Sequence, residues 1–365
     1  MIEPAQSTPP RLGRVLCDVA AATPGPTLLC IAGLHGNEPA GVGALERVAA
    51  RLAAEGGPRL GRLVGLVGNL AALENAERYV DRDLNRGWLQ LERPERSVED
   101  REQQELRAAL EGVLDSSPRG VVVLDMHTTS SSGPAFTLIG DTLANRSFAT
   151  SLGLPIVLGL EELLDGTLLD YLHGRVDVAV GVEGGQHDDP ASVDLLEDVL
   201  HRALARLGMV PQPPSVNGAD QPAHFLEVRY RRPVDPGRDG FRMKPGYLNF
   251  QPVGEGEIVA MDVRGPIRVP EQGLLLMPLY QRLGEDGFFI VRSIRPLWIR
   301  LSAGLRRLRL DRWVHWLPGV RTQAEGTATF AVSRRIARWY ALEIFHLLGY
   351  RRARESGDEL LVTRR

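Results

Sequence analysis

Three short segments of the chain concentrate side chains that bind metal ions and anions. They span residues 35–38 (His-Gly-Asn-Glu), 81–86 (Asp-Arg-Asp-Leu-Asn-Arg) and 125–129 (Asp-Met-His-Thr-Thr). His35 and His127 offer two imidazoles and Glu38 offers one carboxylate. With such a ligand set, catalytic zinc sites keep a fourth coordination position open. The sequence therefore predicts one Zn²⁺ per chain, bound by these side chains.

Hydrolysis at such a site also needs a proton acceptor beside the metal. Glu183 is our candidate, because in Val182-Glu183-Gly184-Gly185 the glycines let the backbone and a substrate approach closely. A solvated loop carboxylate is the alternative interpretation of Glu183. Arg78 and Arg86 supply guanidinium groups suited to a carboxylate or a developing oxyanion, and Asn85 adds an amide.

The elements that must position these residues alternate between strands and helices from about residue 26 to residue 210. Apolar runs predict strands at residues 27–32, 63–67, 121–124, 134–139, 155–158 and 176–182, and periodic segments predict helices at 39–54, 100–114 and 190–207. This alternation is typical of an α/β architecture with a largely parallel sheet. His35, His127 and Glu183 each follow a predicted strand end, where ligands of such sheets bind.

Composition excludes several other classes of protein. The 365 residues, 43% of them hydrophobic, carry a net charge of -3, which is typical of a globular protein that needs no polyanionic partner. Cys30 lies in an apolar run, which favours a buried thiol, and Cys17 has no CxxC partner. His187, followed by two aspartates, is better explained as part of a polar loop than as a metal ligand. The sequence has no GxSxG, GxGxxG or P-loop motif.

Hydropathy predicts a chain that stays outside the membrane. No apolar stretch approaches the ~20 residues of a membrane span, and residues 1–10 lack the apolar core of a signal peptide. We therefore expect no transmembrane segment and a cytoplasmic location. The near-neutral net charge leads us to expect no nucleic-acid partner for the protein as a whole.

The character of the chain changes twice after residue 211. Residues 224–293 carry short alternating runs between turns rich in glycine and proline, which predicts a small all-β domain. From about residue 295 the chain is rich in arginine and tryptophan and poor in acids. The predicted units are therefore a catalytic domain (1–215), a small β domain (216–294) and a basic extension (295–365).

The basic extension is predicted to be partly helical. Residues 301–310 and 336–348 each fit an amphipathic helix, and Pro318-Gly319 separates them. Three roles stay open: lying on an anionic membrane surface, binding nucleic acid, and packing on the rest of the chain or on a second subunit. We favour packing, because arginines scattered through a folded appendage form a solvated rim more often than a binding site. A homo-oligomer is compatible with this interpretation.

Four motifs in order along the chain resemble those of the succinylglutamate desuccinylase/aspartoacylase family. They are HGNE, NLAALENAERYVDRDLNR, DMHTT and VEGG, which begin at residues 35, 69, 125 and 182. The resemblance covers roughly residues 25–293. It implies a zinc-carboxypeptidase-like α/β fold, in which a mixed sheet with flanking helices is followed by a small C-terminal all-β domain. The basic extension rich in Trp and Arg lies outside the resemblance.

The resemblance also implies roles for individual residues. Zinc would be held by His35, Glu38 and His127, with Glu183 as general base and acid. Arg78 would polarise the scissile carbonyl, and Asn85 and Arg86 would hold a substrate carboxylate. The remaining assignments are Asp83 as an acid steadying a ligand histidine, Thr128 as a substrate contact, and Tyr247 or Tyr280 as weak candidates for a substrate-binding tyrosine.

The leading interpretation is a zinc-dependent amidohydrolase acting on a small N-acyl amino acid or a similar small carboxylate. One alternative is a metallocarboxypeptidase that cleaves short peptides. The other is a catalytically silent family member that binds a ligand or a protein. The complete set of ligand, base and arginine residues favours an enzyme.

Overall fold

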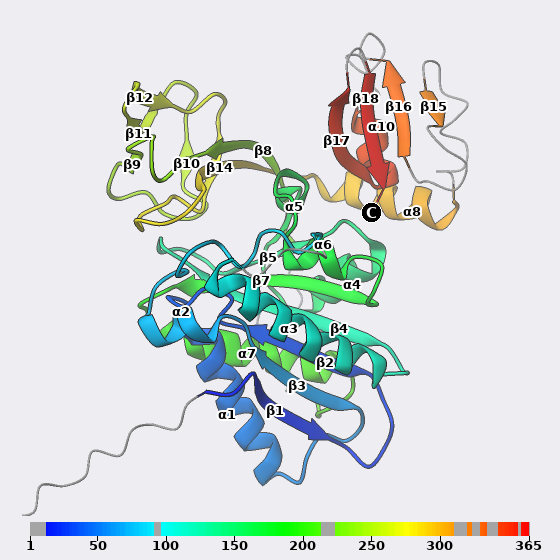
Figure 1. Cartoon of the computed structure of the whole chain (residues 1–365). Helices are drawn as coiled ribbons and strands as arrows, with labels where there is room; N and C mark the ends of the chain where they lie inside the picture. The colour runs from blue at the N-terminus through cyan, green and yellow to red at the C-terminus, as the bar shows by residue number, and fades with distance from the viewer. Residues whose placement is uncertain are drawn as a thin grey trace, which may run out of the picture.

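A computed structural model of the chain describes residues 12–90, 96–212, 223–309, 320–322, 329–333, 342–356 and 359–364. Its largest element is an 11-stranded mixed sheet (Figure 1). In spatial order the strands are β1 (Val15–Ala20), β3 (Arg62–Val67), β2 (Thr27–Ala32), β4 (Val121–Thr129), β7 (Val178–Gln186), β5 (Phe136–Ile139), β6 (Ile156–Leu158), β8 (Phe225–Pro233), β14 (Asp286–Ser293), β13 (Gly273–Leu276) and β10 (Pro252–Val253).

The sheet contains two parallel stretches, with antiparallel pairs between them and at both ends. Strands β3, β2, β4 and β7 run parallel to one another, and so do β5, β6 and β8. Antiparallel pairs join β1 to β3, β5 to β7, and β8 to β14, β13 and β10 in turn. Parallel strands buried on both faces read as continuous apolar runs. This explains why the run at residues 27–32 forms β2, all of which is buried.

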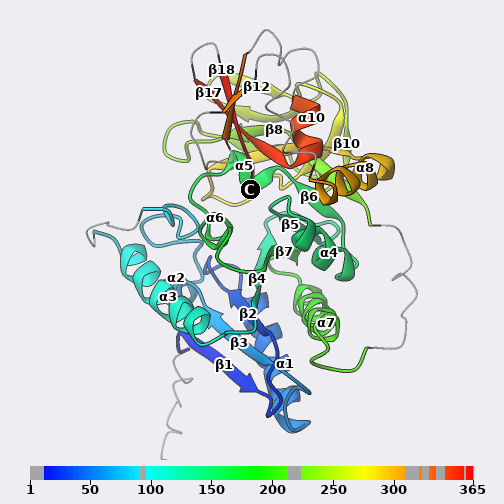
Figure 2. The ribbon, with the colours of Figure 1, turned by 90° about the vertical axis from the view of Figure 1, so that its right-hand side faces the viewer.

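Helices cover both faces of the central strands, and Figure 2 shows α3 on one side of the sheet with α1 and α7 on the other. The helices of the first 212 residues are α1 (Ala40–Ala54), α2 (Leu70–Asn75), α3 (Val98–Asp115), α4 (Leu143–Ser151), α5 (Leu160–Leu163), α6 (Leu168–Leu172) and α7 (Ala191–Arg206). Because side chains alternate between the two faces of a strand, β2 contributes residues to the hydrophobic layers on both faces of the sheet. Leu28 and Cys30 pack with α1 and α7, and Leu29 and Ile31 pack with α3 and α6.

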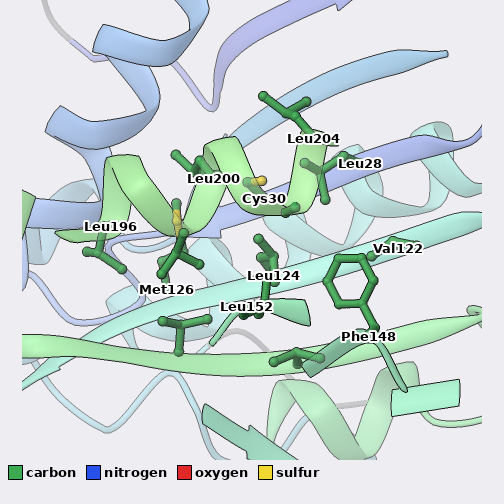
Figure 3. Close-up of a cluster of buried hydrophobic side chains, with 14 of the residues drawn as sticks. Leu28, Cys30, Val122, Leu124, Met126, Phe148, Leu152, Leu196, Leu200 and Leu204 are labelled. Atoms are coloured by element: carbon green, nitrogen blue, oxygen red, sulfur yellow. The ribbon is translucent and has the colours of Figure 1, made fainter. Parts of the chain in front are cut away.

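The layer beneath α7 is a dense hydrophobic cluster (Figure 3). Leu196, Leu200 and Leu204 are spaced by one helical turn, so they face the same strands. Cys30 is fully buried in this cluster as a free thiol, as predicted. Cys17, the other free cysteine, is partly buried at the edge of this cluster, and its burial raises its pKa to about 11.

Helix ends follow local sequence signals. At α3, the Ser97 side chain accepts a hydrogen bond from the backbone N–H of Asp100, whose side chain accepts one in return from the backbone of Ser97. This reciprocal arrangement satisfies two N–H groups at the start of the helix. The predicted helix at residues 100–114 is therefore slightly longer, at Val98–Asp115.

The strands after residue 223 extend the main sheet as well as forming a second one. β8, β14, β13 and β10 continue the main sheet beyond β6. A separate 3-stranded sheet contains β12 (Gly265–Arg268), β11 (Ile258–Asp262) and β9 (Arg242–Met243). The predicted domain boundary at residue 215 lies outside the described residues. Hydrogen bonding across β6 and β8 nevertheless joins the two predicted units into one sheet.

The C-terminal residues contain more strand than the sequence predicts. They form α8 (Pro296–Arg307), α10 (Leu342–Leu348) and a 4-stranded antiparallel sheet. Its strands are β15 (Val320–Thr322), β16 (Thr329–Ser333), β18 (Glu359–Arg364) and β17 (Tyr350–Ser356). The predicted helix at 301–310 is displaced toward the N-terminus as α8. The predicted helix at 336–348 is described only from residue 342, and Pro318-Gly319 lies outside the described residues. Within the described residues, no helix is both long and apolar enough to cross a membrane.

Candidate active site

The site forms where the neighbouring parallel strands β2, β4 and β7 end. His35 follows β2 in a short loop, whereas His127 and Glu183 lie inside β4 and β7 and pair with each other in register. The apolar runs at residues 121–124 and 176–182 predicted strands that end before His127 and Glu183. The strands are longer because the pairing of β4 with β7 continues through these two residues.

His35, Glu38 and His127 converge at one point. One carboxylate oxygen of Glu38 lies 2.8 Å from His35 Nδ1, and the other lies 2.9 Å from His127 Nδ1. All three side chains are buried, and their ligand atoms lie within 4.8 Å of one another. The backbone N–H of Thr128 also donates to Glu38, which fixes the orientation of the carboxylate.

The second ring nitrogen of each histidine faces another carboxylate. His35 Nε2 lies 3.1 Å from Asp83 Oδ1, and His127 Nε2 lies 3.1 Å from Asp125 Oδ1. Such partners orient metal-binding imidazoles and raise their basicity. Asp83 was identified by resemblance, whereas Asp125 was missed as a site residue. The spacing of Asp125 and His127 could have indicated this role, because residues two apart on a strand point to the same face of the sheet.

Charges within this group shift its pKa values. Burial alone raises the pKa of Asp83, but the charges of His35 and Arg78 hold it well below its usual value. Burial likewise opposes ionisation of Glu38, yet His35 and His127 keep its pKa low. Glu38 and Asp83 are therefore ionised next to the two imidazoles. The two histidines and Glu38 form a donor set that matches Zn²⁺.

The loop that carries His35 depends on a close backbone approach at Gly36. A Cβ atom at Gly36 would lie 2.0 Å from backbone atoms of Ala72 in α2. The backbone N–H of Gly36 donates to the carbonyl of Arg78, which ties the loop to the segment that supplies the arginines. Only glycine fits this contact without moving α2.

Glu183 is a buried acid with one carboxylate oxygen that has no hydrogen-bond partner among the described residues. This oxygen is Oε2. Burial raises its pKa to about 8, with His127 and Arg78 opposing the shift and Glu38 adding to it. A carboxyl group with this pKa can exchange a proton near neutral pH. The alternative of a solvated loop carboxylate is therefore wrong.

Arg78 reaches the same point from the segment after α2. Its guanidinium donates to Asp83 Oδ2 at 3.1 Å and to Glu38 Oε1 at 3.4 Å. The following loop is held by Glu99, a fully buried acid at the start of α3. Glu99 accepts hydrogen bonds from the backbone N–H groups of residues 80, 81 and 82 at 2.7 Å, 3.0 Å and 3.2 Å. No sequence pattern predicted this contact.

The remaining predicted substrate residues border the site with partners of their own. The side-chain oxygen of Asn85 accepts from the backbone of Leu168 at 2.8 Å. Thr128 shares a 2.7 Å hydrogen bond with His187 Nδ1, and the other nitrogen of His187 lies 3.1 Å from Gln281 Oε1. His187 therefore belongs to the site wall, and burial lowers its pKa.

Arg86 is engaged by acids of β14 and the preceding turn. Its NH2 group donates to Asp286 at 3.2 Å, and its Nε lies 3.3 Å from Glu285. Neither acid was considered in the sequence analysis, because about 200 residues separate each from Arg86. The predicted role of Arg86 in holding a substrate carboxylate stays a prediction.

The hydroxyl groups of the two tyrosine candidates form hydrogen bonds within the β domain. Tyr247 donates its hydroxyl to Glu257 at 2.7 Å, and Tyr280 donates to the carbonyl of Lys244 at 2.9 Å. Neither lines the two cavities described below.

Two small cavities meet at the site. A more polar one of about 70 Å³ includes Thr128, Ser130 and His187, and a more apolar one of about 80 Å³ includes Asn85 and Arg86. Their walls share His35, Arg78, His127, Glu183, Met277 and Asp286. A small molecule with a central polar bond can therefore place one half in each cavity.

Comparisons with known proteins show what the chain is similar to in fold and in sequence. The structure resembles a succinylglutamate desuccinylase/aspartoacylase from Rhodobacter sphaeroides, with a TM-score of 0.59, 20% identity, and coverage of 76% of this chain and 87% of the other. It also resembles the product-bound ectoine utilization protein EutE (DoeB) from Ruegeria pomeroyi, with a TM-score of 0.58, 20% identity and the same coverages of 76% and 87%. At this identity the likeness concerns the fold.

Residues 24–167 match the model of the succinylglutamate desuccinylase/aspartoacylase catalytic domain. Succinylglutamate desuccinylase of Pseudomonas aeruginosa is 41% identical over 68 residues, which are 19% of this chain and 20% of the relative. The matched stretch thus spans about a fifth of the length of these curated relatives. The family model, the curated relatives and the structural neighbours thus support the assignment to the succinylglutamate desuccinylase/aspartoacylase family that the motifs predicted.

Proposed function

We propose that the protein is a zinc-dependent deacylase that cleaves the amide bond of an N-acyl amino acid or a similar small carboxylate. The observation that carries the proposal is the convergence of His35, Glu38 and His127 beside the carboxyl group of Glu183, whose Oε2 has no hydrogen-bond partner among the described residues. The similarity of residues 24–167 to the catalytic domain of desuccinylases and aspartoacylases supports hydrolysis of an amide.

Zinc bound at such a site polarises a carbonyl group and lowers the pKa of a water molecule. Glu183 takes the proton of the attacking water on its free Oε2 and delivers it to the leaving nitrogen. A pKa of about 8 suits both transfers, because the group must gain and lose the proton near neutral pH. The positive charge of Arg78 stabilises the oxyanion that develops on the carbonyl.

The cavities favour a small substrate. Volumes of about 70 and 80 Å³ leave little room on either side of the shared residues. Thr128 borders one half of the substrate, and Asn85 and Arg86 border the other. This size supports a deacylase over a carboxypeptidase that acts on peptides.

Metal analysis combined with kinetics tests the proposal. We expect about one zinc per chain in the wild type, and loss of both zinc and activity in H35A and H127A, because an open three-ligand site cannot spare a ligand. E183Q should keep zinc but lose about 10²–10⁴-fold in kcat, because an amide cannot relay a proton.

H201A is the matched control, since His201 lies on α7 away from the site. A panel of N-acyl amino acids and dipeptides compares the two classes of substrate. Full zinc occupancy in H35A and H127A, or a nearly normal kcat in E183Q, would contradict the proposal.

A further inference from the structure

A cavity of about 320 Å³ lies outside the candidate active site, and we call it the α8 cavity. Its walls come from α4, β8, the end of β14 and the C-terminal helices α8 and α10. It shares no lining residue with the two cavities at the metal ligands. At about 30 Å³ for each water-sized group, its volume holds about ten non-hydrogen atoms. The α8 cavity is therefore large enough for a small organic molecule that does not touch the metal ligands.

Part of the wall of the α8 cavity is built from buried polar side chains. Arg146 of α4 and Ser302 of α8 line it and are only 6% and 2% exposed. Arg146 donates through NH2 to Asp141 Oδ2 at 2.8 Å and through NH1 to Ser302 Oγ at 3.3 Å. Ser302 in turn donates to the backbone carbonyl of Leu347 in α10 at 2.6 Å. These bonds join three helices, so this part of the wall is formed before a ligand arrives.

The charged side chains of the α8 cavity favour an anion. Its wall contains three arginines, Arg146, Arg229 and Arg295, and one acid, Glu227. Arg146 is paired with Asp141, and Arg229 NH1 lies 3.5 Å from Glu227 Oε1. The side chain of Arg295 is exposed and has no ion-pair partner among the described residues. An anionic group can therefore use the guanidinium of Arg295 without breaking an existing ion pair.

The remaining wall of the α8 cavity is largely apolar. It includes the indole of Trp298, one helical turn after Arg295, together with Ile294, Ile299 and Leu347. An apolar body placed against these side chains removes apolar surface from water, and an aromatic ring also gains from contact with the indole. Mostly apolar walls with a few polar groups are typical of small-molecule sites.

We propose that the α8 cavity is a binding site for a small organic monoanion with an apolar body, of the class of aromatic carboxylates. The carboxylate binds Arg295, and the ring lies against Trp298 and the neighbouring isoleucines. This site is separate from the metal ligands, so the inference does not rest on the proposed deacylase function. The ligand contacts α4, β8 and α8 together, so its binding also stabilises the folded protein.

Benzoate and benzamide form a matched pair of probes, because they have the same number of non-hydrogen atoms and differ in charge. With the full-length wild type, calorimetric titration should give benzoate a dissociation constant of about 1 mM or lower, at least about tenfold below that of benzamide. R295Q should weaken benzoate about tenfold and leave benzamide unchanged, since it removes only the charge. W298A should weaken both probes. Saturating benzoate should raise the melting temperature of the wild type but not that of R295Q.

R300Q and L297A are the controls on the same helix, because Arg300 and Leu297 are exposed and lie outside the α8 cavity. Arg295 makes no side-chain cap to α8, so R295Q leaves the start of the helix intact. H35A and R86A should retain the benzoate affinity of the wild type.

Three results would overturn the inference. The first is equal affinity for benzoate and benzamide, or no saturation by benzoate below about 10 mM. The second is the same benzoate affinity in R295Q as in R300Q. The third is benzoate binding that is lost in H35A or R86A and kept in R295Q, which would assign it to the candidate active site.

Discussion

At the scale of single residues, Glu183 gives the metal-free protein a defined dependence of stability on pH. Burial raises its pKa from 4.5 to about 8 in the folded state. The stabilising contribution of a raised pKa is complete below the unfolded value, near 4.5, and is lost as pH rises through the folded value, near 8. The folded protein therefore becomes less stable across this window.

We expect E183Q to lack this part of the pH dependence. In chelator, the unfolding free energy of the wild type should fall relative to E183Q between about pH 5 and pH 8, by up to about 1.4 kcal/mol per unit of pH. Urea denaturation at both pH values measures the difference. Parallel pH profiles for the two proteins would show that Glu183 is solvated.

His35, Glu38 and His127 could be predicted to converge because they stand close in sequence to strand ends. His35 and Glu38 share one loop, and His127 lies near the end of β4. Glu285 and Asp286 could not be predicted as partners of Arg86, because they meet it only when β14 joins the sheet. Contacts of this kind follow from the tertiary fold and leave no local pattern.

At the scale of elements, the start of α3 positions the segment that carries Arg78, Asn85 and Arg86. Glu99 Oε2 accepts the N–H groups of Asp81 and Arg82. In E99Q an amide NH2 can occupy that position and leave these N–H groups unpaired, at a cost of about 1–3 kcal/mol for each group that stays buried. We expect kcat/KM to fall about tenfold with zinc content unchanged, because the arginines move relative to the metal ligands.

E105Q provides the comparison, since Glu105 lies on the same helix and its side chain is 54% exposed. Metal analysis and steady-state kinetics of both variants distinguish positioning from loss of the site. Equal kcat/KM values in E99Q and the wild type would show that the loop keeps its place without Glu99.

The success of the strand predictions depended on burial. Strands β2 and β4 are buried along their whole length, so they appear in the sequence as continuous apolar runs. Strand β1 was missed because it is an edge strand with a mixture of exposed and half-buried residues. Residues 350–356 read Tyr-Arg-Arg-Ala-Arg-Glu-Ser and form β17, although their charge resembles that of a solvated surface. Their pairing with β18 is a tertiary feature that composition does not reveal.

At the scale of the whole molecule, the two smaller sheets lie at the same end of the structure in both views (Figures 1 and 2). The β domain adds its strands to the main sheet and contributes Met277 and Asp286 to the cavities. The predicted domain boundaries at residues 215 and 294 divide the chain by sequence. The walls of the candidate site nevertheless contain residues from both sides of the boundary at residue 215. The residues of the candidate site therefore come from two separate parts of one continuous sheet.

The C-terminal unit is anchored to the catalytic part through a buried ion pair. Arg306 of α8 donates to Asp141 Oδ2 at 2.8 Å and to the Asp141 backbone carbonyl at 2.6 Å. Ser302, one turn earlier, is also buried. Phe330, Phe345 and other apolar residues form a separate small core in this unit. These contacts favour packing on the rest of the chain over a free basic helix.

Removal of residues 300–365 should therefore lower solubility or change the oligomeric size while zinc stays bound. The truncation removes Arg306 from Asp141, so this buried carboxylate, which also pairs with Arg146, loses part of the positive charge that compensates it. Size-exclusion chromatography, metal analysis and thermal unfolding measure the three consequences.

The outer face of α8 leaves Leu297 and Trp298 exposed beside arginines, so binding to anionic liposomes is the competing expectation. A soluble truncation of unchanged stability that loses affinity for anionic liposomes would support the membrane role, because packing predicts a destabilised protein and no such affinity.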